Sequence, residues 1–359
     1  MRRFLAIRQD NNGDVTLVGP ALRALAAHGH VTLACGPSGE GAARLLPCVD
    51  DVLVARADWI EGEPRPVDAV RIADDVTRYA AVRADEAFVF TSFHQSPLPT
   101  ALLLRLAGIR RIGAVSVDYP GSLLDLRMSV GDDIHEVERA LALVGAAGYA
   151  LPPGDDAALA YRNLPSRESG LPQRYVAVQP GATVPARAWD PHKLRALVRC
   201  LRNAGEDVVI VGSANERKLA RTVAGDSGAL DLCGATTYAQ FAAVIRDARV
   251  LVVGNTSGIH VASAVGTPVV TIFPPTIPLV RFAPWRVPYV VLGNQTIACA
   301  GCRARTCPFP GQPCTGCVGV DDVLHALDEL GSRPASGAAL ASRPARGAAL
   351  ASRYDKVPA

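Results

Sequence analysis

The 359-residue sequence has few aromatic residues, no marked excess of charge of either sign and no unbroken long hydrophobic span. Aromatic residues make up 5% of it, and 37 basic residues against 34 acidic ones leave a formal net charge of +3. So small a charge excludes nucleic acid as an expected partner. The composition, 49% hydrophobic and 20% charged, is that of a globular protein rather than a disordered or fibrous one. The length predicts two domains of about 150–180 residues each.

The sequence also predicts neither a transmembrane segment nor a signal peptide. Residues 250–280 contain no Lys, Arg, Asp or Glu, but GNTSG, Pro268 and the Pro274-Pro275 pair interrupt them. Near the N-terminus, Arg8 ends the apolar run of residues 4–7. We therefore expect a cytoplasmic protein, for which peripheral association with a membrane stays open.

Short apolar runs alternate with amphipathic stretches along most of the chain, and this alternation predicts an α/β fold. The predicted strands are residues 4–7, 31–34, 52–55, 87–90, 111–114, 175–179, 207–211, 250–253 and 268–273. The predicted helices are residues 20–29, 42–46, 67–83, 97–107, 134–146, 191–203, 214–224, 238–247 and a segment after 258. Strands separated by single helices pair in parallel. We expect two doubly wound, Rossmann-like domains facing a central cleft, with ligands at the carboxyl ends of the strands.

Composition shifts along the chain suggest where these domains begin and end. Residues 1–150 form the first predicted domain, a proline-rich linker spans 151–173, and residues 174–330 form the second domain. Residues 331–359 hold the near-repeat GSRPASGAAL/ASRPARGAAL, whose composition predicts a flexible low-complexity tail. Binding of an acidic partner by this basic tail is the alternative interpretation.

The segment RQDNNGD, which directly follows the first predicted strand, is the first candidate site. Asn11, Asn12 and Gly13 tolerate unusual backbone angles and so permit a tight turn. Asp14 then lies near a helix start, where it is either an N-cap or a general base that accepts a proton from a sugar hydroxyl. Asp10 is the competing carboxylate, for which a structural role is the simpler interpretation.

Two further loops follow predicted strands of the second half of the chain. In the first, Gly181 permits close approach of a ligand, Thr183 offers a hydroxyl and Arg187 a guanidinium for phosphate oxygens. An ordinary strand-to-helix loop is the alternative there. The second is a run of small residues that exposes N–H groups at a helix start, which is typical of a diphosphate site. Its candidate contacts are Asn255, Thr256, Ser257, Gly258 and His260. A buried structural role for the histidine stays open.

Five of the nine cysteines crowd into one short segment, and the other four are scattered as expected of small buried side chains. Two C-x2-C pairs, Cys299/Cys302 and Cys314/Cys317, could place four thiolates around a structural zinc or iron ion, with Cys307 spare or substituting. Free thiols or a disulfide are the alternatives.

Together, the motifs RxDxxGD, QPGA…W and GNTSGIHxASAxGTPVVTIFPPT resemble glycosyltransferase family 9, the lipopolysaccharide heptosyltransferases. The resemblance runs from about residue 3 to 330. It implies a GT-B fold, an acceptor-binding N-terminal domain, a C-terminal domain that binds a nucleotide-sugar donor, and inverting transfer without a catalytic metal. A subgroup of the family, which transfers heptose to proteins, carries a four-cysteine iron site, and the cysteine-rich segment of this chain resembles it.

By motif, the resemblance makes Asp14 the base and assigns Thr183 and Arg187 to the donor diphosphate. It assigns Thr256, Gly258 and His260 to the donor loop. Asn255 departs from the family, because an acidic residue typical of enzymes that use ADP-heptose is expected there. ADP-heptose is the favoured donor, and that departure leaves the base and the sugar open.

The acceptor is a glycan, a small molecule or a protein, and its candidate contacts are Asp10, Asn12 and His94. Two other functions stay open at this point: a nucleotide-sugar epimerase or hydrolase on the same fold, and a non-catalytic nucleotide-sugar binder. The first would need a second acidic pair that the sequence does not show. The second predicts loss of the base, whereas Asp14 is present.

Overall fold

The computed structural model describes residues 1–60, 65–131 and 133–331. The predicted C-terminal tail lies outside these residues, apart from Gly331. The chain divides into two compact units, one of Met1–Asn163 and one that begins at Leu164. Each unit is described by itself below.

The first unit is built on six parallel strands in the order β3-β2-β1-β4-β5-β6. Their bounds are β1 (Arg2–Arg8), β2 (Gly29–Cys35), β3 (Asp51–Val54), β4 (Glu86–Val89), β5 (Arg111–Val115) and β6 (Leu126–Met128). The order is that of a doubly wound sheet, whose direction of winding reverses between β1 and β4. The central strand β1 is apolar and fully buried over residues 4–7, as its sequence predicts.

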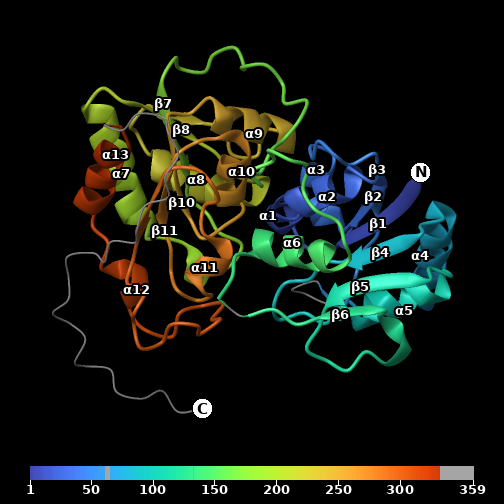
Figure 1. Cartoon of the computed structure of the whole chain (residues 1–359). Coiled ribbons are helices and arrows are strands. Elements are labelled where there is room, and N and C mark those ends of the chain that lie inside the picture. The colour runs from blue at the N-terminus through green and yellow to red at the C-terminus, as the bar shows by residue number, and fades with distance from the viewer. Residues whose placement is uncertain (61–64, 132, 332–359) are drawn as a thin grey trace. The chain divides into compact units, whose positions relative to one another are not determined.

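Helices cover both faces of this sheet (Figure 1). They are α1 (Asn12–Leu17), α2 (Gly19–Ala26), α3 (Glu40–Ala43), α4 (Ala69–Val82), α5 (Leu98–Leu106) and α6 (Glu136–Ala146), with short 3-10 turns η1 (Pro37–Gly39) and η2 (Gly121–Leu123). The helices α2 and α6 pack together on one face, and α4 and α5 pack on each other and on the core at the other face.

The second unit repeats this topology, with strand order β12-β11-β10-β7-β8-β9 and parallel pairing throughout. The strands are β7 (Tyr175–Gln179), β8 (Asp207–Ile210), β9 (Leu230–Asp231), β10 (Val250–Gly254), β11 (Val269–Ile272) and β12 (Tyr289–Leu292). When the strands are numbered within this unit and read from β9, the order is 3-2-1-4-5-6, as in the first unit. The winding reverses between β7 and β10.

The helices of the second unit also lie on both faces (Figure 1), with α7, α8 and α13 packed on one face and α9 and α10 on the other. The helices are α7 (Pro191–Asn203), α8 (Arg217–Ala224), α9 (Tyr238–Arg246), α10 (Gly258–Val265), α11 (Leu279–Phe282), α12 (Pro313–Gly316) and α13 (Val320–Gly331), with η3 (Pro185–Arg187) and η4 (Ala214–Glu216).

The α/β class, the parallel pairing and the predicted strands are confirmed by the structure. The edge strands β6, β9 and β12 and the helix α13 were missed by the sequence interpretation. Part of the predicted linker packs on the first unit, since Arg23 binds Asp155 and Arg162 binds the carbonyls of Pro47 and Val49. Among the described helices, none is both long and apolar enough to cross a membrane.

Candidate functional site

In each unit, the candidate residues follow the two strands between which the winding reverses. In the first unit, the segment from Arg8 to Asp14 follows β1, and Ser92 and Gln95 follow β4. In the second unit, residues 179–187 follow β7 and residues 254–260 follow β10. Loops that leave neighbouring strands in opposite directions at such a point leave a crevice, where ligands of open α/β sheets bind.

Asp14 belongs to a compact charged cluster in the first unit. Its Oδ1 accepts a hydrogen bond from Nη2 of Arg8 at 2.8 Å, and it lies 3.5 Å from the hydroxyl of Ser92. The same Nη2 donates to Ser92 Oγ at 2.8 Å. The Asp14 side chain keeps 15% of its surface exposed, whereas that of Arg8 keeps 3%. The buried guanidinium of Arg8 therefore orients the carboxylate, which keeps part of its surface open to solvent.

Arg8 also pairs with Asp10, whose Oδ2 lies 2.8 Å from the guanidinium Nε. Burial raises the pKa of the Asp10 carboxyl, and the charge of Arg8 only partly opposes that shift. Burial alone would lower the pKa of Arg8, but Asp10, Asp14 and Glu136 together raise it. The arginine is therefore charged at any working pH, and it neutralises carboxylates that could not be buried alone.

The interpretation of Asp14 as an N-cap is wrong, because Asn11 caps α1 and its side chain accepts a bond from the Gly13 N–H at 3.0 Å. Asp14 is the third residue of the helix.

Of the candidate acceptor contacts, Asn12 has a structural role, since its Oδ1 accepts a bond from the Ala42 N–H at 2.8 Å. His94 is exposed, and its ring packs edge-on against that of Phe93.

Gln9 anchors the loop that carries Arg8 and Asp10. Its Nε2 donates to the Ala55 carbonyl at 3.0 Å and to the Tyr79 hydroxyl at 3.3 Å, and its Oε1 accepts from Thr100 at 3.2 Å. Gln9 lies between two residues whose side chains join the charged cluster. Its bonds therefore hold that stretch of backbone against β3 and α4.

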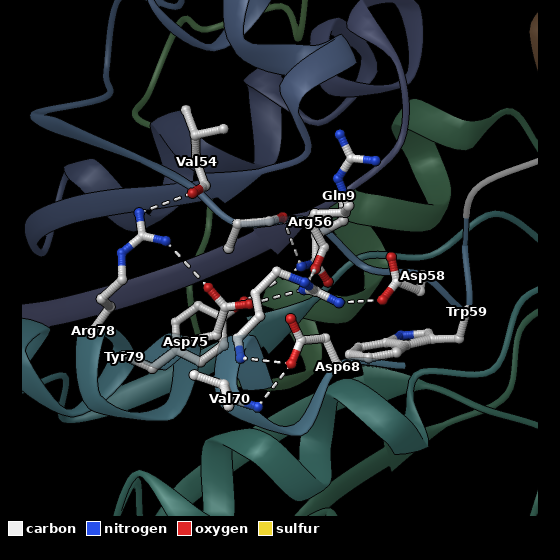
Figure 2. A network of polar contacts seen from close by, with 12 residues as sticks. Gln9, Val54, Arg56, Asp58, Trp59, Asp68, Val70, Asp75, Arg78 and Tyr79 are labelled. Carbon is white, nitrogen blue, oxygen red and sulfur yellow. Dashed lines mark hydrogen bonds and ion pairs between the residues drawn. The ribbon is translucent and has the colours of Figure 1, made fainter. Parts of the chain in front are cut away.

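The end of β3 and the helix α4, to which Gln9 bonds, are joined by the network of polar contacts in Figure 2. Two buried carboxylates of this network, Asp58 and Asp75, both pair with Arg71. Arg78 donates to Asp75 at 3.1 Å and to the Val54 carbonyl at 2.8 Å, which fastens α4 to the end of β3. Sequence reasoning missed this network, because its members are spread over residues 54–79 with no distinctive spacing.

In the second unit, the loop after β7 is closely packed around Gly181. A Cβ atom built on Gly181 would lie 1.7 Å from Oε1 of Glu216, so only glycine leaves room there for the glutamate. The other carboxylate oxygen accepts bonds from the N–H and hydroxyl of Ser213 at 2.6 and 2.8 Å. Thr183 is exposed and Arg187, in η3, is half-buried.

Glu216 is the functional candidate that sequence reasoning missed in this unit. It follows β8, the second strand of the unit, which is where dinucleotide-binding folds carry an acidic residue for ribose. The capping pattern Ser213-x-x-Glu216 was the available signal, but it indicates only a helix start.

The loop after β10 leads directly into α10. Asn255 is buried, and its Nδ2 has no hydrogen-bond partner among the residues that the structure describes. A Cβ atom on Gly258 would lie 2.1 Å from Oε1 of Gln179, which places this glycine against the end of β7. His260 is buried in the first turn of α10, with its ring centroid 6.3 Å from that of Phe282. The structure therefore brings the loop after β10 against the start of the loop after β7.

The cysteine-rich segment, residues 299–317, follows β12, and its arrangement differs from the metal site that the sequence analysis considers. In the described part of the chain, no group of three or more His, Cys, Asp or Glu residues is placed to hold a metal ion. Cys317 donates instead to the Cys314 carbonyl at 3.6 Å. Burial raises the pKa of Cys299, with smaller contributions from Cys302 and Cys307. The thiols are free, and in this arrangement the four proposed ligands do not fit a metal.

Two of the scattered cysteines, Cys35 and Cys233, are buried as expected, but Cys200 is exposed. Burial raises the pKa of both buried thiols to about 12. Because alkylation requires the thiolate, iodoacetamide at neutral pH is expected to modify Cys200, Cys302 and Cys317 in the native protein and the two buried thiols only after unfolding. Peptide mass spectrometry measures this order. Resistance of Cys302 and Cys317 that a chelator abolishes would instead show a bound metal.

Comparisons with known proteins point to one family. A family model described as glycosyltransferase family 9 (heptosyltransferase) matches residues 93–312. Lipopolysaccharide heptosyltransferase 3 of Escherichia coli is 28% identical over 110 residues, which are 29% of this chain and 32% of that protein. That match spans about a third of the length of the curated relative.

Solved structures share the fold. The ADP-heptose lipopolysaccharide heptosyltransferase II of E. coli superposes with a TM-score of 0.71 at 19% identity, over 92% of this chain and 98% of that chain. The iron-containing heptosyltransferase TibC of enterotoxigenic E. coli, solved with ADP-D-β-D-heptose, gives a TM-score of 0.56 at 15% identity, over 92% and 76% of the two chains. These similarities establish the GT-B architecture of two Rossmann-like units. Since the family model matches more than half of its 359 residues, the chain belongs to glycosyltransferase family 9, the heptosyltransferase family.

Proposed function

We propose that the protein is an inverting glycosyltransferase that moves a heptose from ADP-heptose to a hydroxyl of a glycan, small-molecule or protein acceptor. The observation that carries the proposal is the carboxylate of Asp14, which Arg8 and Ser92 hold beside the switch point of the first unit with part of its surface exposed. The family and its relatives support the choice of donor.

The chemistry assigns a separate task to each unit. Asp14 takes the proton of the acceptor hydroxyl while that oxygen bonds to the anomeric carbon of the donor sugar. The bond from that carbon to the diphosphate oxygen breaks on the opposite face, and its electron pair leaves with the nucleoside diphosphate. One displacement inverts the anomeric centre. Arg8 keeps the base aimed without sharing its proton, because a guanidinium does not titrate in this range.

The second unit supplies the donor contacts. Arg187 and Thr183 offer donors to the diphosphate, and the N–H groups at the start of α10 add positive potential where negative charge develops on the leaving group. Glu216 is placed to accept the ribose hydroxyls, as an acid after the second strand does in related folds. The buried amide of Asn255 offers an uncharged hydrogen-bonding group where ADP-heptose enzymes carry an acid.

A thermal-shift and calorimetric panel of ADP-, GDP-, UDP- and dTDP-sugars tests the donor assignment. A ligand at 100 times its Kd stabilises the fold by about 2.7 kcal/mol. We expect a selective response to ADP-heptose. Arg187→Met is expected to raise the Kd about tenfold or more, because it removes a charge-assisted bond of about 1.5–3 kcal/mol. The exposed Arg221→Met on α8 is the matched control and leaves the Kd unchanged.

Silence across the whole panel would contradict the proposal. Selective binding of another nucleotide would keep the transferase and change its donor. Consumption of the donor without any acceptor would point to the hydrolase or epimerase alternative, whereas binding without turnover in the presence of acceptors would point to a non-catalytic binder.

A further inference from the structure

The backbone around Arg187 is held by a segment more than a hundred residues away in the sequence. The Ala186 N–H donates to the Arg305 carbonyl at 3.0 Å. The side-chain amide of Gln312 donates to the Ala186 carbonyl at 2.8 Å and approaches the Ala188 carbonyl at 3.4 Å. The two acceptor carbonyls belong to the residues before and after Arg187, so one side chain from the cysteine-rich segment bridges the two neighbours of Arg187.

The end of β10 packs against the backbone of Arg187 itself. A Cβ atom built on Gly254 would lie 2.7 Å from the Arg187 carbonyl oxygen, so the glycine allows the two backbones to touch. Gly254 is the last residue of β10 and directly precedes the donor loop. The backbone of residues 186–188 therefore contacts both the strand that leads into the donor loop and the cysteine-rich segment.

Gln312 has a backbone conformation that indicates constraint. Its φ of 46° and ψ of 70° lie in the left-handed region, which residues other than glycine and asparagine rarely adopt. It precedes Pro313, which disfavours the right-handed helical region for the residue before it. Its carbonyl accepts bonds from the Thr315 and Gly316 N–H groups at 3.0 and 2.7 Å. The surrounding bonds thus hold an unfavourable backbone that aims the side chain at residues 186–188.

We propose that Gln312 is a positioning residue for donor binding, which fixes the loop of residues 184–188 and through it the guanidinium of Arg187. The inference rests on the proposed function for the role of Arg187. A glutamine amide suits the task, because it has two N–H donors and both of the groups it meets are carbonyl acceptors. Without it, the loop keeps its bond to Arg305 but loses the bridge across Arg187, so Arg187 samples more orientations and binds the donor less tightly.

The variant Gln312→Asn isolates the side chain from the backbone. Asparagine tolerates the left-handed conformation, so the fold is expected to keep its Tm, but its shorter side chain cannot reach residues 186–188. Gln312→Glu keeps the length and places a carboxylate against two carbonyls, so it is expected to have the larger effect. Gln240→Ala removes a glutamine whose side chain accepts bonds from Thr237 at the start of α9, away from residues 184–188 in the sequence, and it is the matched control.

Two readouts separate this proposal from the proposed function. Hydrogen–deuterium exchange of the peptide covering residues 184–188, with no ligand present, is expected to accelerate about tenfold in Gln312→Asn and not in Gln240→Ala. Calorimetry with ADP is expected to show a Kd about tenfold higher in Gln312→Asn, and steady-state kinetics with ADP-heptose a raised KM with a smaller change in kcat.

Unchanged exchange at residues 184–188 in both Gln312 variants would overturn the positioning role. So would accelerated exchange with unchanged affinity for ADP, since the loop would then move without consequence for the donor. If the wild-type protein itself bound none of the nucleotides, the proposed function would fail, and the exchange experiment would still decide whether Gln312 holds the loop.

Discussion

Replacing Asp14 by asparagine is expected to lower the rate of sugar transfer by about 10²–10⁴-fold, the usual contribution of a general base. Asparagine has nearly the shape of aspartate, and its carbonyl oxygen still accepts the bonds from Arg8 and Ser92. It cannot take a proton from the acceptor hydroxyl. The loss is expected in kcat, with the Kd of the donor changed by no more than about threefold, since the proposed donor contacts belong to the second unit.

A carboxylate of the same unit serves as the control for this variant. Asp118 accepts a bond from the Ser96 hydroxyl at 2.9 Å on an exposed loop, and Asp118→Asn is expected to keep the wild-type rate. Product formation followed by mass spectrometry, with donor affinity measured separately by calorimetry, gives both quantities. Wild-type turnover of Asp14→Asn would show that another group takes the proton.

Replacing Arg8 by methionine is expected to have the largest effect on stability, a loss of about 3–5 kcal/mol in the free energy of unfolding. Methionine keeps much of the buried stem but leaves Asp10 and Asp14 without the cation that neutralises them. Chemical denaturation at neutral pH measures the loss. We expect it to shrink as the pH is lowered, because burial raises the pKa of Asp10 and its protonation removes one buried charge.

A second substitution tests the cause of that loss. In Arg8→Met/Asp10→Asn, one of the two orphaned carboxylates is gone, and the double variant is expected to recover about 1 kcal/mol or more relative to Arg8→Met. Gln95, which donates to Asp10 at 2.5 Å, can still bond to the asparagine oxygen. Strictly additive losses would show that the arginine stabilises the unit through packing rather than through the carboxylates.

Local pattern was sufficient for the elements with the strongest signals. The strands β1 and β7 contain continuous apolar runs at residues 4–7 and 175–178, and β7 and α7 have the predicted bounds. Two of the three missed strands have weak patterns, because β6 has three residues and β9 has two exposed ones. The third, β12, is an apolar run that the sequence interpretation passed over. A short strand at the edge of a sheet buries little apolar surface, so selection for hydrophobic periodicity is weak there.

The candidate residues likewise divide into those that a local pattern indicates and those that it does not. Asp14, Arg187 and the 254–260 loop are candidates from sequence alone, because each follows an apolar strand and offers residue types suited to phosphate or proton chemistry. The capping role belongs to Asn11 rather than to Asp14 three residues later, because the residue at which the helix begins decides which side chain faces the free N–H groups. Sequence spacing near a helix start does not resolve that difference.

The sequence alone determined the α/β class, the two units and the strand ends at which candidate chemistry lies, because these depend on periodicities within about ten residues. Tertiary structure decided which side chains share each site. It placed Ser92 beside Asp14, Glu216 against Gly181 and Gln312 over residues 186–188, and it left the cysteine thiols without a metal-binding geometry in the described part of the chain. These partners lie tens of residues apart, and they meet only because parallel strands bring their carboxyl ends to a common edge.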